Sequence, residues 1–144
     1  MLSFVLAAVL SSGVLAEQPP SQTEKRTERE ALDPTLDQAV EQAAREWLAL
    51  VDARDWQASF DAMGPQMRQA NTLEGWTAAA KQAHGSLGPA ISRKLTSTRY
   101  VNAPPKGYRE IVFATDFADR SEVIETVTLE KQAGVWKVVG VMLD

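Results

Sequence analysis

The sequence predicts an α+β domain in which about three N-terminal helices pack on one side of a four-stranded antiparallel sheet. Two patterns carry this prediction. Apolar residues recur every three or four positions from residue 35 to about residue 84, which is the period of amphipathic helices. From residue 91 to the end they mostly alternate, which is the period of strands, and turn residues separate the alternating segments. The strands are therefore expected to pair in sequential order, as a meander.

The composition divides the chain into three parts. Residues 1–16 carry no charged side chain and place small residues after an apolar run, which predicts a signal peptide cleaved after Ala16. That run is shorter than the roughly 20 residues of a membrane-spanning helix. Residues 17–34 are polar and charged with almost no apolar side chains, which predicts a flexible linker. Residues 35–144 are expected to form the single domain, located in the periplasm or secreted.

Each of the three expected helices has an N-terminal signal and an apolar face. Proline is tolerated at a helix start, aspartate caps a helix, and an Asn-x-x-Glu pattern permits reciprocal capping. In chain order these signals are Pro34, Asp55, and Asn71 with Glu74. The apolar positions are Leu36, Val40, Ala43, Ala44, Trp47, Leu48 and Val51 in the first helix, Trp56, Phe60, Met63 and Met67 in the second, and Leu73, Trp76, Ala80 and Ala83 in the third.

Four strands are expected, over residues 91–101, 108–118, 122–131 and 135–143. The first is rich in Ser, Thr and Arg and should be the most exposed. The last is apolar on both faces, so it should lie inside the sheet or beneath another layer. We expect Trp136 on this strand to be mostly buried, and interpret the four tryptophans at 47, 56, 76 and 136 as packing residues rather than a ligand site.

The charge balance and residue usage exclude several classes of function. The chain has 15 Lys and Arg against 19 Asp and Glu, a net charge of −4, which argues against a nucleic-acid partner. It contains no cysteine, so it has neither disulfides nor a lipid-modified cysteine. One histidine without cysteine argues against a zinc site. Asp116, Asp119 and Glu122 could hold a hard cation, but aspartate is also favoured in hairpin turns, and we expect a turn. No cofactor is expected.

Several short motifs resemble the bacterial family catalogued as domain of unknown function 4019, over roughly residues 38 to 143. They are Trp47-Leu48, Val51-Asp52, Trp76, Leu87-Gly88, Ser92-Arg93, Pro105-Lys106-Gly107-Tyr108, Phe113-Ala114-Thr115-Asp116-Phe117, Glu125-Thr126-Val127-Thr128-Leu129 and Gly134-Val135-Trp136-Lys137-Val138. The resemblance implies a small exported bacterial domain, often tethered, with no established activity. The order of its elements is similar to that of cystatin-like folds, in which a bent sheet cradles a helix.

Two charged residues are candidate site residues because alternation places them among apolar neighbours. Glu125 shares a face with Val123 and Val127, and a buried carboxylate needs a partner or must be neutral. Arg93 on the first strand is the natural partner by the same parity, and Arg99 is the alternative if the strand order differs. An ion pair at the margin of the sheet is the favoured interpretation over a pocket acid or base.

His84, the only histidine, lies at a predicted helix end, where a cation is favourable. We interpret it as a surface cap rather than a catalytic residue, because no nucleophile with suitable spacing accompanies it.

Three hypotheses about function follow from the sequence. The favoured one is a non-enzymatic exported domain that binds a partner protein or an envelope component. The second is a carrier that holds a small apolar ligand between helices and sheet. The third is an enzyme of the isomerase or dehydratase type that uses Glu125 or His84. The second and third need an open concave face on the sheet, which the sequence does not reveal.

Overall fold

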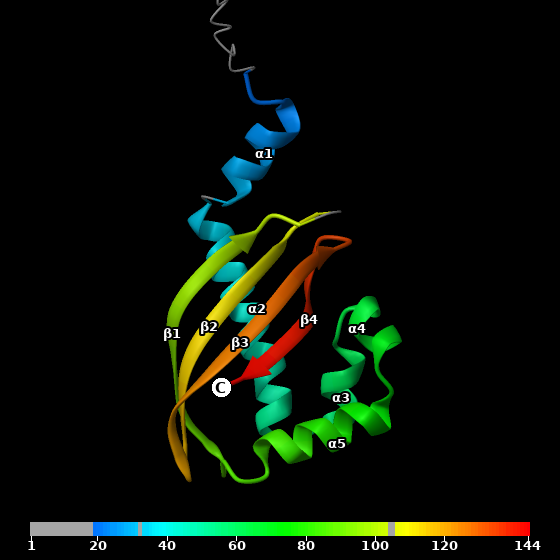
Figure 1. The fold of residues 1–144 in the computed structure, drawn as a ribbon, viewed down its shortest axis with the longest axis vertical. Helices are drawn as coiled ribbons and strands as arrows, with labels where there is room; N and C mark the ends of the chain where they lie inside the picture. The colour runs from blue at the N-terminus through cyan, green and yellow to red at the C-terminus, as the bar shows by residue number, and fades with distance from the viewer. Residues whose placement is uncertain (1–18, 32, 104–105) are drawn as a thin grey trace, which may run out of the picture.

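The structure is a computed structural model that describes residues 19–31, 33–103 and 106–144. The predicted signal peptide lies outside these residues. Helices precede strands along the chain, and the predicted α+β class is confirmed (Figure 1). The elements are α1 (Gln22–Ala31), α2 (Pro34–Asp52), α3 (Trp56–Asp61), α4 (Pro65–Ala70), α5 (Leu73–His84), β1 (Ala90–Val101), β2 (Tyr108–Phe117), β3 (Arg120–Gln132) and β4 (Val135–Leu143).

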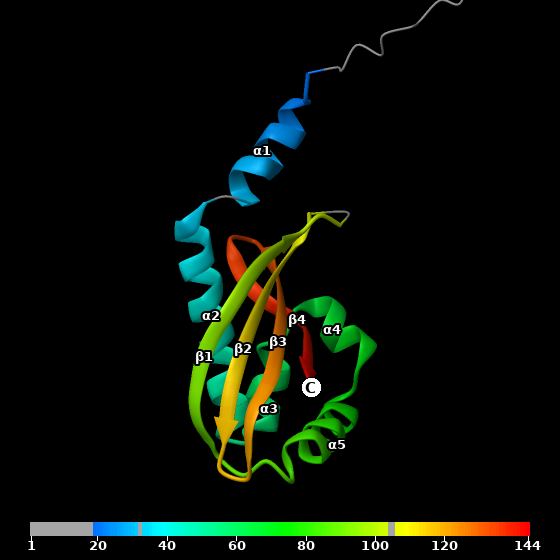
Figure 2. The same ribbon diagram turned by 60° about the vertical axis from the view of Figure 1, so that its left-hand side comes forward.

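The sheet is an antiparallel meander with the order β1-β2-β3-β4, as the sequence predicts. Alternate residues of β2 and β3 are buried, and we call the side to which they point the inner face. The helices α2 to α5 lie on the side of this face, and α2 runs along it (Figures 1 and 2). The main core joins the two layers; its fully buried members include Val40, Ala44 and Leu48 of α2, Ile111 and Phe113 of β2, Val127 and Leu129 of β3, and Val138 of β4.

The helix α2 begins one residue earlier than predicted. Asp33 is its N-cap, because the carboxylate accepts a hydrogen bond from the backbone N–H of Thr35 at 2.9 Å, and Pro34 is the first helical residue. Among the described residues, no helix combines the length and the apolarity needed to cross a membrane.

A helix occupies most of the segment for which the sequence predicts a flexible linker. Ser21 and Glu24 start α1 as a capping box: the backbone N–H of Ser21 donates to Glu24 Oε2 at 2.5 Å, and that of Glu24 donates to Ser21 Oγ at 3.2 Å. Of the α1 residues whose burial is described, none belongs to the apolar core. The helix continues beyond one end of the sheet (Figure 2). Local capping by Ser21 and Glu24 accounts for a helix in a segment that has almost no apolar residues.

The predicted second helix is two short helices, so the described part of the chain has more helices than the three expected. Pro65 has no amide hydrogen and starts α4, while the preceding Gly64 donates its N–H to the carbonyl of Val138 at 2.7 Å. Met63 forms a parallel bridge with the same residue. The residues between α3 and α4 thus provide a hydrogen-bond partner for part of the outer edge of β4.

The cap of α5 is Thr72 rather than the predicted Asn71. Thr72 Oγ1 accepts from the backbone N–H of Gly75 at 3.0 Å. Asn71 instead donates its side-chain amide to the carbonyl of Met67 at 2.8 Å, which satisfies a carbonyl at the end of α4. The two adjacent polar residues divide the two helix ends between them.

The strand β4 lies at an edge of the sheet with helices against its inner face, so it is not inside the sheet but lies beneath another layer on one face only. Its outer edge has no full strand partner, and the side chains of Val135 and Met142 are 53% and 55% exposed. Trp136 is partly buried and packs against the main core, in agreement with the expectation that most of this side chain is buried. The apolar sequence of β4 therefore belongs to an edge strand that packs on helices through one face only.

Candidate functional site

The structure brings the two predicted site residues together. Arg93 Nε lies 2.6 Å from Glu125 Oε2, and Arg93 Nη2 donates to Glu125 Oε1 at 3.2 Å. Glu125 is completely buried on the inner face of β3, and the strand between the two residues is β2, as predicted. The ion pair satisfies a carboxylate that would otherwise be desolvated without a partner.

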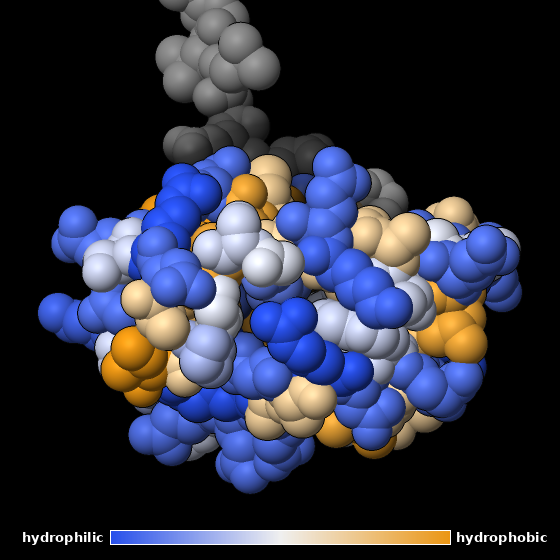
Figure 3. Space-filling model, turned by 90° about the horizontal axis from the view of Figure 1, so that it is seen from below, coloured by the Kyte–Doolittle hydropathy of each residue, from blue (hydrophilic) through white to orange (hydrophobic). Residues whose placement is uncertain are grey.

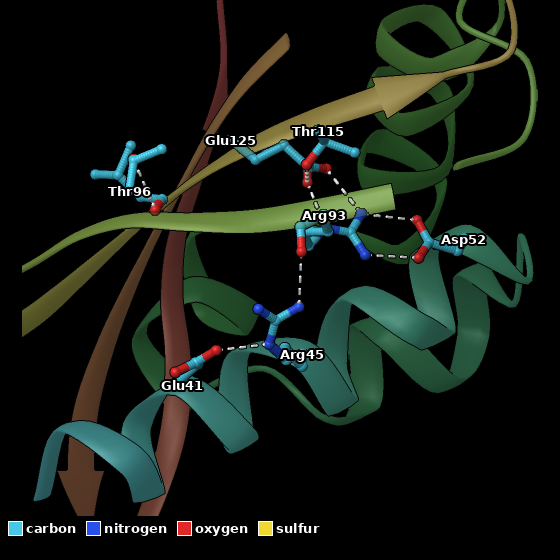
Figure 4. A network of polar contacts seen from close by, with 8 residues as sticks. Glu41, Arg45, Asp52, Arg93, Thr96, Thr115 and Glu125 are labelled. Carbon is cyan, nitrogen blue, oxygen red and sulfur yellow. Dashed lines mark hydrogen bonds and ion pairs between the residues drawn. The ribbon is translucent and has the colours of Figure 1, made fainter. Parts of the chain in front are cut away.

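Two further residues complete this cluster (Figure 4). Asp52, the last residue of α2, receives Arg93 Nη1 at 2.9 Å and Nη2 at 3.1 Å. Thr115 on β2 donates its hydroxyl to Glu125 Oε2 at 2.5 Å. The guanidinium of Arg93 therefore connects α2 with β3, the strand two positions away from β1 in the sheet. Parity on β2 could have suggested Thr115, but nothing in the sequence places Asp52 beside Arg93.

The cluster holds the guanidinium of Arg93 in its charged form. Burial alone would lower the pKa of Arg93, but the hydrogen bonds and charges of Asp52 and Glu125 outweigh it and raise the pKa above its ordinary value. Glu125 receives three hydrogen bonds and is closed to solvent. A carboxylate that is ion-paired and enclosed in this way positions elements and is poorly placed to transfer a proton to a substrate.

Arg99, the alternative partner, points to the opposite face. The register of β1 against β2 shifts between Leu95 and Ser97, so the alternation of side chains reverses past Thr96. Arg99 instead pairs with Glu110 on β2 at 2.8 Å, and its side chain is 65% exposed. The β-bulge also interrupts the alternation that the sequence predicts from residue 91 onward.

Beside the cluster, a cavity of about 200 Å³ separates α2 and α5 from the end of β4. Its lining is apolar apart from one imidazole, and consists of Trp47, Leu48, Val51, Trp76, Ala79, Ala80, Ala83, His84, Val141 and Leu143. The three alanines on α5 leave the space that larger side chains would fill. Of these, Ala79 and Ala83 are exposed, so they lie at the mouth of the cavity.

Ser59 of α3 orients the two tryptophans of the cavity wall. Trp47 Nε1 donates to the carbonyl of Ser59 and Trp76 Nε1 donates to its hydroxyl, both at 2.9 Å. The indole rings lie 5.7 Å apart between centroids. Their polar edges are thus satisfied at Ser59, which is fully buried. Nothing in the sequence indicates this role of Ser59, because a lone serine on a short helix carries no signal.

The structure places His84 in the cavity wall, which corrects the expectation of a surface cap. The residue is 8% exposed, and its ring packs between Trp56 and Phe117 with centroid distances of 6.5 and 6.1 Å. The chain turns back after α5, so other parts of the protein cover the end of this helix. The sequence alone shows only where the helix ends. Burial lowers the pKa of His84, and the negative charges of Glu125 and Asp52 oppose that shift only in part.

The acidic residues near the β2–β3 hairpin serve the turn. Asp116 Oδ1 accepts a hydrogen bond from the backbone N–H of Glu122 at 2.9 Å. Glu122 has a φ of 55°, a left-handed conformation that this bond stabilises. Within the described residues, no group of three or more histidine, cysteine or acidic side chains is arranged to hold a metal ion.

Residues 43–141 match the sequence profile of the family described as "Protein of unknown function (DUF4019)". The chain belongs to this family. The resemblance predicted from the sequence motifs is thereby confirmed. Among solved structures, Aln2 from a Streptomyces species, determined at 1.8 Å, is similar with a TM-score of 0.53 and 15% identity, over 79% of this chain and 93% of that one. Identity this low shows a shared fold alone. A comparison with curated proteins finds no match. The cystatin-like assignment stays a prediction.

The ionic cluster of this DUF4019 protein generates a prediction about coupling. Arg93→Met leaves the fully buried charge of Glu125 without its partner and should cost about 3–5 kcal/mol of stability. Glu125→Gln should cost less, because Arg93 keeps Asp52. The double variant should cost less than the sum of the two single changes. Denaturant unfolding of the four proteins measures all three quantities.

Arg99→Met is the matched control, since it removes an arginine from the same strand and breaks an exposed pair. It should cost no more than about 1 kcal/mol. Additive effects in the Arg93 and Glu125 cycle, or equal costs for Arg93 and Arg99, would contradict a coupled buried pair.

His84 generates a prediction about pH. Because its pKa is lower in the folded protein than its ordinary value of 6.5, the unfolded chain takes up the proton first as pH falls. The free energy of unfolding of the DUF4019 protein should therefore be highest above about pH 7.5 and should decrease from there to about pH 5.5, where most carboxylates remain charged. Urea unfolding across this range measures the decrease.

The control for this prediction is His84→Gln, which removes the only histidine. Its stability should change much less over the same range. An equal slope in the two proteins, or a wild type that gains stability on acidification, would show that the imidazole is not desolvated.

Proposed function

We propose that the protein is a non-enzymatic binding domain that holds a small apolar ligand in the cavity between α2, α5 and β4. The cavity itself carries this proposal. Its walls are two indole rings, aliphatic side chains and three alanines, and its mouth lies at Ala79 and Ala83. Pockets that bind small molecules are typically mostly apolar with a few polar groups that fix orientation. Here His84 is the polar group.

The volume limits the size of the ligand. Pockets for drug-sized molecules span about 300–1,000 Å³, and apolar cavities of about 150 Å³ take up benzene. At about 200 Å³, the cavity suits a molecule with one ring or a short branched chain. The indole N–H groups of both tryptophans are bound to Ser59, so the rings offer their apolar faces to such a ligand.

The surroundings of the two candidate catalytic residues, Glu125 and His84, support the proposal that the protein is not an enzyme. Glu125 is enclosed and bound to Arg93 and Thr115. Among the described residues, the imidazole of His84 has no hydrogen-bonded partner that would orient it as a general base. An isomerase or dehydratase built on either residue has less support for these reasons.

The alternative is a domain that binds a partner protein or an envelope component. On the face shown in Figure 3, hydrophobic side chains appear as separate small groups among hydrophilic ones. Large protein-binding sites more often show a contiguous apolar patch. This alternative would gain support from a specific partner that binds when the cavity is filled.

Export to the periplasm or outside the cell also belongs to the proposal, and the pattern of residues 1–16 supports it. When the protein is expressed in a bacterium with a periplasm, the intact mass of the periplasmic protein should correspond to a chain that begins at Glu17. Ala16→Phe should retain the uncleaved mass, because the peptidase requires a small residue there. A wild-type protein found uncleaved in the cytoplasm would contradict export.

The ligand site is tested by closing its mouth. Benzene serves as the probe, and the indole N–H signal of Trp76 and the imidazole signals of His84 report its binding by nuclear magnetic resonance. Wild-type protein should show saturable shifts at these signals. Ala83→Leu places a larger side chain at the mouth and should weaken benzene binding at least tenfold, by about 1.4 kcal/mol.

Ala78→Leu is the matched control. Ala78 is exposed on the same helix, does not line the cavity, and leucine is nearly as good a helix former as alanine. This variant should bind benzene like the wild type. Absence of saturable shifts in the wild type, or equal affinities in the two variants, would overturn the proposal.

A further inference from the structure

A second pocket lies at the opposite end of the inner face, where the sheet extends past the start of α2. Its volume is about 560 Å³, and its wall includes Thr23 and Arg26 of α1. The wall is formed by all four strands, the loop before β2 and the first helix, and consists of Thr23, Arg26, Leu36, Tyr100, Lys106, Gly107, Tyr108, Arg109, Lys131, Ala133, Gly134 and Trp136. It shares no residue with the apolar cavity.

The charge of this wall is opposite to that of the chain. Four of its residues are basic and none is acidic, although the whole chain carries a net charge of −4. Asp37, which is not part of the pocket wall, forms an ion pair with Arg109 at 2.9 Å and offsets one of these charges. A concave wall of one sign concentrates the field and attracts counter-ions. The pocket is therefore a positive site in an acidic protein.

Two aromatic rings are paired with two of these cations across neighbouring strands. The guanidinium of Arg109 lies 5.5 Å from the centroid of Tyr100, and the ammonium of Lys131 lies 5.8 Å from that of Trp136. Each cation is opposite its ring in the sheet register. Such pairs stabilise a sheet by modest amounts. Here they also place flat apolar surface and positive charge side by side.

The backbone at the rim is shaped for close approach. Gly107 has a φ of 79°, and a Cβ there would collide with the ring of Tyr100. The hydroxyl of Tyr100 donates to the carbonyl of Lys106 at 3.5 Å, which fixes the loop against the ring. Within the described residues, no hydrogen bond engages the ammonium groups of Lys106 and Lys131. Both cations therefore remain available to a ligand.

We propose that this pocket binds an organic anion that carries a carboxylate or phosphate on a flat apolar body. Lys106 and Lys131 would hold the charged group, with Arg109 as a fixed positive wall, and Trp136 would pack on the flat body. The volume lies within the range of small-molecule sites. This site is independent of the apolar cavity, so either proposal can fail without the other.

The test uses three probes with isotope-labelled protein, and the indole N–H signal of Trp136 reports binding. Naphthoate supplies charge and a flat body, naphthamide supplies the flat body alone, and inorganic phosphate supplies charge alone. Naphthoate should bind at least tenfold more tightly than either of the others, and its affinity should fall as salt is added. Equal affinity of naphthamide or of phosphate would overturn the proposal.

Variants locate the site. Lys106→Gln combined with Lys131→Gln should weaken naphthoate binding at least tenfold while the indole signals of Trp47 and Trp76 stay in place, which shows an intact fold. Lys81→Gln combined with Lys94→Gln removes the same charge from exposed positions outside the pocket and should leave the affinity within about twofold. Equal losses in the two double variants would mean that only net charge matters, and would overturn the assignment to this pocket. Binding that Ala83→Leu abolishes would place the probe in the apolar cavity and would also overturn it.

Discussion

The inner face of the sheet depends on how Arg93 neutralises Glu125. A completely buried carboxylate on an apolar sheet is tolerated only with a close cation and filled hydrogen-bond positions, and Arg93 and Thr115 provide these. The same guanidinium reaches Asp52, so one side chain connects the end of α2 to the middle of the sheet. The cluster thus helps to fix the relative position of the helical and sheet layers beside the apolar cavity.

The apolar cavity is a consequence of this arrangement together with the small side chains of α5. Arg93 holds the end of α2 toward β1, and the break between α3 and α4 ties Gly64 to β4. The helix α5 then spans the remaining opening, with the buried Ala80 in the cavity wall and the exposed Ala79 and Ala83 at the mouth. Tightly packed protein interiors seldom keep voids of this size. A cavity lined by two oriented tryptophans and one desolvated histidine is therefore a candidate functional site.

The two ends of the inner face differ because the helices cover them unequally. At one end, α2, α5 and β4 enclose an apolar space whose only titratable wall residue is His84. At the other end the strands pass the start of α2, and basic and aromatic side chains line an open pocket whose wall includes residues of α1. A domain with two such sites can bind two ligands of different chemistry. The positive pocket also shows why a net charge of −4 does not describe every part of the surface.

Much of the fold followed from local pattern. The period of the apolar residues identified the helical region from residue 35 onward and the four strands, and parity on β1 and β3 brought Arg93 and Glu125 to one face. Parity is reliable only where the ladder is regular, and the bulge after Leu95 is the reason that Arg99 points elsewhere. The capping box of α1 was also present in the sequence, but a charged segment without an apolar face was interpreted by composition as a linker.

The sequence by itself determined the class of the fold, the family and the partner of the buried carboxylate, since each depends on short-range periodicity or on motifs in order. Only the tertiary structure decided that His84 is buried, that Asp52 joins the cluster and that alanines on α5 leave a cavity. These features depend on which distant segments meet. Burial is a property of neighbours in space, and a one-dimensional pattern records only which side of its own element a residue occupies.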